Sequence, residues 1–267
     1  MRAFTMIDCV ALATLLALTS VPTHAAMTSS TAPPSWGMEL RMGPFRPRIS
    51  DNARDRDYYA LIYADHNKRS VFKNRPLLKT VETSRYLLTG FGLLGATVSV
   101  GHWVATAPTR VCQDPNDANV TVGCTPASVW QSTPGNDTTA LTVVPIGVGV
   151  VYRFDFASRR LSVPLVPYAK AGLDYALWWN TAGGRLSKSA VTKGSGGTLG
   201  YTGALGLMLN LDWIEPNTAS RARATSGIAD SYVYVDWTLR VSDGFSDPKR
   251  LGTSGRVLAV GLALDML

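Results

Sequence analysis

Residues 163–179 read VPLVPYAKAGLDYALWW, and two kinds of side chain alternate along this stretch. Every second residue from Leu165 to Trp179 is apolar, whereas the residues between them include Lys170 and Asp174. A period of two is the period of a β-strand, so the stretch predicts a strand with one apolar face and one polar face. Its apolar face ends in aromatic side chains, as the lipid-facing side of a transmembrane β-strand does.

The same alternation recurs along most of the 267-residue chain. The apolar faces carry Leu and Val, and the opposite faces carry Gly, Ala, Thr and charges. A soluble sandwich would instead bury its apolar faces against each other, and small inward residues suit a narrow barrel. The sequence therefore predicts an all-β fold, an antiparallel up-and-down transmembrane barrel of about eight strands, with ten as the alternative. The other predicted strands are 36–43, 76–88, 96–106, 138–156, 198–213, 231–241 and 256–267.

The connections between these strands differ in length in a regular way. Long loops at 44–75, 107–137 and 180–197 fall on one side, and short turns at 89–92 and 157–162 fall on the other. Outer-membrane barrels have long extracellular loops and short periplasmic turns, which sets the expected orientation. Two segments need separate predictions: YYALIY at 58–63 is a short strand or helix within its loop, and 214–229 is a short periplasmic amphipathic helix or lid.

The N-terminus is typical of an exported protein. Met1 and Arg2 precede an apolar run from Val10 to Leu18, and small residues follow at Ala25 and Ala26. This is the pattern of a cleaved secretory signal peptide; the alternative, an uncleaved anchor, has too short an apolar run to span a membrane. The predicted domains are a signal peptide (1–25), a flexible entry segment (26–35) and an outer-membrane barrel (36–267).

The formal net charge of +7 bears on the expected partners. Nucleic acid is not expected, because an exported protein rarely meets it and basic residues such as Lys68, Arg69 and Lys73 are scattered. Anionic lipid and polysaccharide are better partners for such a charge. We expect a monomer without a cofactor, contacting outer-membrane lipid, lipopolysaccharide or surface polysaccharide, and the barrel-assembly machinery during biogenesis.

Cys112 and Cys124 flank a polar loop, QDPNDANVTVG. An isolated cysteine pair in an exported protein favours a disulfide that closes the loop. A metal site is the alternative, but it needs more soft ligands than this loop contains.

Charged residues recur on the faces that point into the predicted barrel. Inside a narrow lumen such charges must pair, because an unpaired buried charge is costly. We predict a cross-barrel network of ion pairs that closes the lumen; the alternative is a wider lumen in which each charge is hydrated. The network residues are Glu39, Arg41, Arg153, Asp155, Lys170, Asp174, Asp236 and Arg240, with Asp212, Asp265 and Glu82 as further inward acids. The outward aromatics predicted to anchor the membrane interfaces are Tyr152, Phe154, Tyr175, Trp179, Trp213 and Trp237.

Three features raise other functions. GFGLLG at 90–95 matches the dinucleotide-binding pattern GxGxxG, but a predicted strand follows it where that site needs a helix. A lipid-modifying enzyme would need a catalytic base, and the histidines of the mature chain are His66 and His102, neither tied by sequence to Ser84 or Ser99. We therefore expect no enzyme. Inward glycines, which would suit a small-solute channel, are Gly147, Gly149, Gly200 and Gly206.

The chain also resembles a known family. The segments TTALTVVPIGVGVVYRFDFA, VPLVPYAKAGLDYALWW, GYTGALGLMLNLDWIEP and DSYVYVDW look like those of small predicted outer-membrane β-barrel proteins from myxobacteria. The resemblance covers most of the chain after Trp36 and implies the fold and the location, but no activity. The sequence therefore predicts a structural or surface-interaction role, with a small-solute channel as the first alternative and a lipid-modifying enzyme as the second.

Overall fold

The computed structural model describes residues 33–51, 56–57, 59, 63, 76–108, 110–114, 117–121, 129–132, 138–156, 158, 163–186, 194–245 and 251–267. The predicted signal peptide lies outside the described residues, and so do His66 and Cys124. The signal peptide and the disulfide between Cys112 and Cys124 therefore stay predictions.

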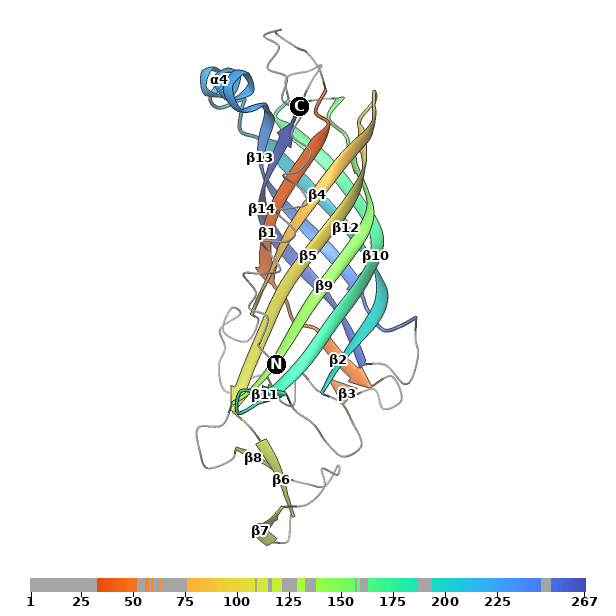
Figure 1. Ribbon diagram of the computed structural model, residues 1–267, viewed down its shortest axis with the longest axis vertical. Helices are drawn as coiled ribbons and strands as arrows, with labels where there is room; N and C mark the ends of the chain where they lie inside the picture. Colours follow the sequence, from red (N-terminus) through yellow and green to blue (C-terminus); the bar gives the residue numbers. More distant parts are fainter. Residues whose placement is uncertain are drawn as a thin grey trace. The chain divides into compact units, whose positions relative to one another are not determined.

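Eight long strands form a closed ring (Figure 1). In ring order they are β1 (Trp36–Pro44), β4 (Leu77–Thr89), β5 (Leu93–Pro108), β9 (Thr138–Arg153), β10 (Leu165–Ala182), β12 (Ser195–Asn210), β13 (Ile228–Val241) and β14 (Leu251–Met266). Each strand pairs antiparallel with its neighbour, and β14 pairs with β1 to close the ring. The predicted eight-stranded antiparallel barrel is confirmed.

The ring has two ends with different connections. The long-loop end carries the connections β1–β4, β5–β9, β10–β12 and β13–β14, and the short-turn end carries β4–β5, β9–β10 and β12–β13. Parts of the predicted long loops are in fact strands, because the chain pairs again after leaving the ring. β2 (Arg48–Asp51) pairs with the beginning of β14, and β3 (Arg56–Asp57) pairs with β2. β11 (Arg185–Leu186) pairs with β10, and β6 (Arg110–Asp114), β7 (Asp117–Thr121) and β8 (Val129–Ser132) form a small separate sheet.

The helix α4 (Pro216–Ser226) follows β12 at the short-turn end. Proline stands in its first turn, where no backbone N–H is missed, and Gly227 ends it in the left-handed region with φ 68°. The predicted helix is present, but the expectation that it is amphipathic is wrong: none of its residues is buried. Within the described ranges, no helix is long and apolar enough to cross a membrane.

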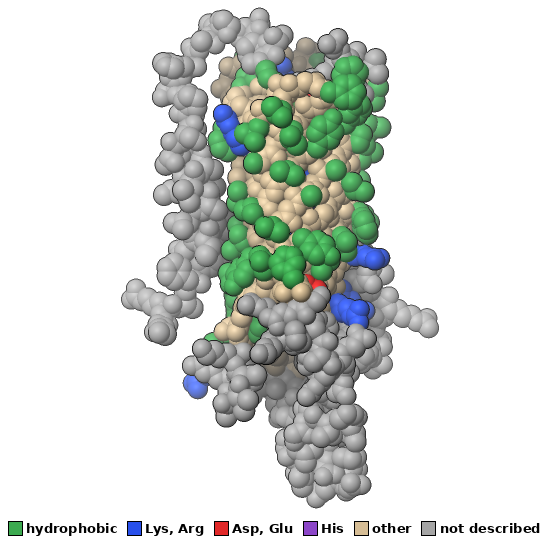
Figure 2. All heavy atoms as spheres, turned by 90° about the vertical axis from the view of Figure 1, so that its right-hand side faces the viewer, with side chains coloured by type: hydrophobic (Ala, Val, Ile, Leu, Met, Phe, Trp, Pro, Cys, Tyr) green, Lys and Arg blue, Asp and Glu red, His purple; other side chains and the backbone are tan. Residues whose placement is uncertain are grey.

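Burial alternates along most of each long strand, and the outward side chains are mainly apolar. In β10, Leu173 is 51% exposed and its neighbour Asp174 is 1% exposed. Figure 2 shows hydrophobic side chains spread over one face of the barrel. Water-soluble proteins rarely expose apolar surface of this extent. The outward set includes Leu40, Val81, Val98, Val148, Val150, Leu205, Leu207, Val235, Leu258, Val260 and Leu262.

Candidate functional site

The lumen is built around one buried guanidinium. Arg153, at the end of β9, is 1% exposed. Its Nη1 donates to both carboxylate oxygens of Asp265 in β14, at 2.8 and 3.0 Å, and its Nη2 donates to Glu39 Oε1 in β1 at 2.6 Å. Hydrogen bonds between charged groups are about twice as strong as neutral ones. One side chain therefore crosses the lumen and binds two neighbouring strands.

The ion pairs continue from Glu39 around the ring. Lys170 Nζ donates to Glu39 Oε2 at 2.6 Å and to Glu82 Oε1 at 2.7 Å. Arg41 then lies 3.5 Å from the second oxygen of Glu82 and 3.3 Å from Asp236 Oδ2. Charges of opposite sign thus alternate without a break from Asp265 to Asp236.

Neutral hydroxyls satisfy carboxylate oxygens at both ends of this chain of charges. Tyr86 donates to Asp265 at 2.7 Å, and Tyr168 donates to Asp236 at 3.0 Å. Thr238 donates to the other oxygen of Asp236 at 3.0 Å. A buried charge is tolerated when its remaining lone pairs are hydrogen-bonded.

The other predicted network residues lie in three places. Arg240 lies 3.0 Å from Asp174, which also accepts a hydrogen bond from Ser242 at 2.7 Å. Asp155 is buried just beyond the end of β9. Asp212 does not face the lumen, because β12 ends at Asn210; it lines a pocket beside α4 instead.

Inward aromatic rings lie on glycines of the neighbouring strand. Tyr168 pairs in register with Gly206, and Tyr234 pairs with Gly261. A Cβ added at either glycine would lie 2.5 Å from the facing ring. Gly206 and Gly261 therefore make space for tyrosine rings inside the lumen. The sequence signal is an aromatic residue opposite a glycine, and finding it requires the strand register.

This arrangement predicts the effect of one methyl group. We expect Gly206→Ala to destabilise the barrel by about 1–3 kcal/mol, because the ring of Tyr168 must leave its position and weaken its bond to Asp236. Gly203→Ala is the matched control on the same strand, since its Cβ would meet only a backbone oxygen at 3.8 Å. Urea unfolding of the two variants in detergent compares them, and equal midpoints would contradict the prediction.

An apolar plug occupies the lumen towards the long-loop end. Trp103, fully buried in β5, packs against the rings of Phe45 at 5.9 Å and Tyr59 at 5.8 Å between centroids. Its Nε1 donates to the backbone oxygens of Phe45 at 3.1 Å and Pro76 at 3.0 Å. The remaining buried members of the plug are Ile49, Leu78, Ala105, Leu141, Val143, Ala176, Val257 and Ala259.

Tyr59 and Tyr63 come from the segment predicted to be a short strand or helix. Tyr63 N donates to Tyr59 O at 2.9 Å, which is a helical hydrogen bond, and the two rings stack. Tyr63 donates its hydroxyl to Asn180 Oδ1 at 3.2 Å. Burial raises the pKa of Tyr63, so its phenol stays a neutral donor. Tyr59 and Tyr63 thus pack onto the plug, which sequence periodicity does not reveal.

The predicted interface aromatics lie on the outer surface to different degrees. Tyr152, Tyr175, Trp213 and Trp237 are exposed, whereas Phe154 and Trp179 are half-buried. Phe154 packs against Phe91, with the ring centroids 5.3 Å apart.

The residues considered for catalysis are not brought together. His102 points outward from β5, while Ser84 and Ser99 point inward. In the part of the chain that the structure describes, no group of three or more His, Cys, Asp and Glu side chains could hold a metal ion.

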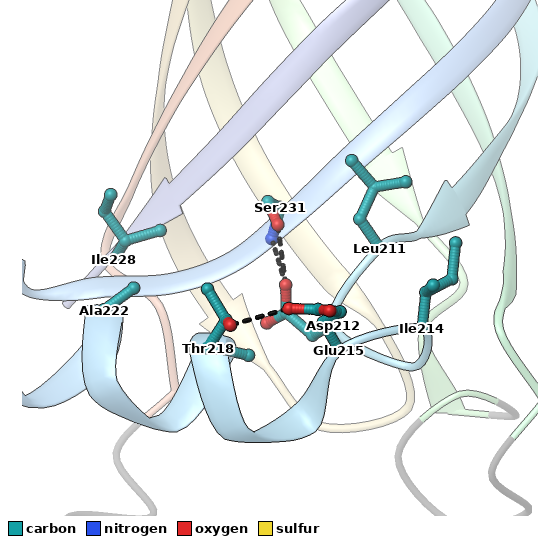
Figure 3. A pocket seen from close by; sticks show the side chains of 9 residues that line it. Leu211, Asp212, Ile214, Glu215, Thr218, Ala222, Ile228 and Ser231 are labelled. Carbon is teal, nitrogen blue, oxygen red and sulfur yellow. Dashed lines mark hydrogen bonds between the residues drawn. The ribbon is translucent and has the colours of Figure 1, made fainter.

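A pocket of about 330 Å³ lies between α4 and the start of β13 (Figure 3). Asp212 accepts hydrogen bonds from Ser231 in its centre, and Glu215 accepts one from Thr218 at 2.7 Å. The Arg223 guanidinium donates to the backbone oxygen of Ala229, which fixes the other end of the helix against β13. The remaining lining residues are Leu211, Ile214, Ala219, Ala222 and Ile228.

No protein-family model matches this chain, and no curated protein matches it. Several solved structures have a similar fold. Neisserial surface protein A is 11% identical with a TM-score of 0.46, covering 86% of this chain and 96% of that one. The Escherichia coli outer membrane protease OmpT is 8% identical with a TM-score of 0.39, covering 90% and 99%. The Pseudomonas aeruginosa outer membrane protein OprG is 11% identical with a TM-score of 0.36, covering 87% and 93%. Likeness at this level carries no information about activity.

Proposed function

We propose that this chain is a bacterial outer-membrane barrel whose lumen is closed to solutes and which acts through its structure and its outer surface. The observation that carries the proposal is the unbroken chain of ion pairs from Asp265 to Asp236, fixed across the lumen by Arg153 and Lys170. The interior of an eight-stranded barrel is narrow enough for side chains to fill it.

The outward face supports a membrane location. Leu205 is 61% exposed and Leu258 is 61% exposed, so these side chains would contact water in a soluble protein. Burying such side chains in lipid is worth about 1.5–3 kcal/mol each. The strands of 9–18 residues match or exceed the roughly 9–11 residues that cross a bilayer.

The apolar plug and the chain of ion pairs both support a closed lumen. The plug around Trp103 fills one end with apolar side chains, and the ion pairs bind strands on opposite sides of the ring. A solute would have to break hydrogen-bonded ion pairs and leave buried charges alone, which is costly. The channel alternative relied on inward glycines, but Gly206 holds the ring of Tyr168 and a Cβ at Gly147 would lie 2.7 Å from Ser99 Oγ.

Liposome swelling tests the proposal. Vesicles containing the refolded chain are expected to exclude small sugars such as arabinose, as protein-free vesicles do. A change in gel mobility on boiling verifies folding, and vesicles with an open porin serve as the positive control. Sugar entry at a rate near that of the porin would contradict a closed lumen, and failure to enter membranes would contradict the location.

A further inference from the structure

Charge on the outward face of the ring is sparse and of one sign. By the alternation of the described ring strands, three charged side chains point outward: Lys79 and Arg85 in β4, and Arg256 in β14. All three are exposed and all three are cations. A carboxylate does not occur on this face of the ring strands, whereas the lumen holds carboxylates on five strands.

Two of these cations lie towards the long-loop end, on either side of β1. Lys79 pairs in register with Met42 of β1 and with His102 of β5. Arg256 lies four residues beyond Val260, the residue that pairs with Met42 on the other side. The Arg256 guanidinium lies 5.9 Å from the centre of the Trp237 ring, an exposed aromatic side chain.

Lys79 and Arg85 lie on the outward face of one strand, with Val81 and Thr83 between them on that face. They are six positions apart, or about 20 Å along the strand. At the usual barrel tilt of about 40°, and with side chains that extend towards water, their charges reach both borders of a band about 25 Å tall. Arg85 lies 4.8 Å from the Trp36 ring at the other border. A cation in contact with lipid is stable where an anionic group meets it.

The distance between Lys79 and Arg256 indicates which kind of anionic ligand could bind both side chains. From the register, Lys79 and Arg256 are offset by about 13 Å along the strands and about 10 Å across them. A single phosphate is too small to bind both side chains at once, and a head group with separated phosphates can. We propose that Lys79 and Arg256, with His102 beside Lys79, bind the phosphates of an outer-leaflet glycolipid of the lipopolysaccharide type. This rests on the proposed outer-membrane location and on the orientation predicted from the loop lengths, with the long-loop end outside the cell.

The test measures lipid-dependent stability of the full chain. The protein is refolded into phospholipid vesicles containing either phosphorylated lipopolysaccharide or the same lipid after removal of the lipid A phosphates. We expect the unfolding temperature to be higher with the phosphorylated form. The double variant Lys79→Gln/Arg256→Gln is expected to lose most of this difference, because both charges are removed without shortening the exposed side chains greatly.

Arg85→Gln is the matched control, since it removes an outward cation at the opposite border and should keep the difference. The Lys79→Arg variant should keep it too. Retention of the full difference in the double variant would overturn the proposal, and so would an equal shift with phosphatidylglycerol in place of lipopolysaccharide. The swelling assay on the same vesicles reports separately on the closed lumen, so the two proposals can fail independently.

Discussion

Replacing Arg153 with methionine should cost the barrel about 3–5 kcal/mol of unfolding free energy, the usual loss when one partner of a buried ion pair is removed. The variant leaves Glu39 and Asp265 buried after losing hydrogen bonds of 2.6 to 3.0 Å. Urea unfolding in detergent, followed by tryptophan fluorescence, measures the loss as a shift in midpoint.

Arg185→Met provides the control, because Arg185 is an exposed cation in β11 outside the lumen. Surface substitutions of this kind usually change stability by less than about 0.5 kcal/mol. Equal midpoints for the two variants would contradict the prediction, because they would show that the buried ion pairs of Arg153 add no more to stability than an exposed cation does.

Trp103→Ala is expected to destabilise the barrel by about 3–5 kcal/mol, the range for truncating a large buried aromatic. It removes the ring between Phe45 and Tyr59 and leaves two backbone oxygens without their indole donor. It should also raise the rate of sugar entry into vesicles above that of the parent chain, because the plug loses its largest member.

Trp213→Ala is the comparison, since Trp213 is 62% exposed and lies away from the plug. This variant should keep both the lumen closed and most of the stability. If Trp103→Ala left sugar entry unchanged while destabilising the barrel, closure would depend on the ion pairs alone.

The barrel itself could be predicted because its signal is local. Alternation in 163–179 places Asp174 inside and Leu173 outside with no knowledge of neighbouring strands, and the structure agrees. The helix α4 could be predicted from the break at Glu215-Pro216 and its end at Gly227. Its lack of a buried face agrees with its own residues, PNTASRARATS, in which alanine is the only apolar side chain after the proline.

The candidate site was predictable as a set of inward charges but not as pairs. Parity places Glu39, Arg153 and Lys170 inside, whereas their partnership depends on the shear of the ring, which brings residues more than 100 positions apart into contact. The same reason explains Asp212: parity extended β12 past Asn210, where the chain turns away. The role of Trp103 could not be predicted, because it depends on contacts with Phe45 and Tyr59, which are more than 40 positions away in the sequence.

Arg153 also bears on the order in which the barrel is assembled. Its two partners, Glu39 and Asp265, belong to β1 and β14, the first and last strands of the ring, which pair with each other only on closure. In an open sheet these strands are at opposite edges, so one guanidinium cannot bind both. The stabilisation from Arg153 is therefore complete only at the final step. Its ion pairs favour the closed barrel over a sheet in which β1 and β14 are not yet paired.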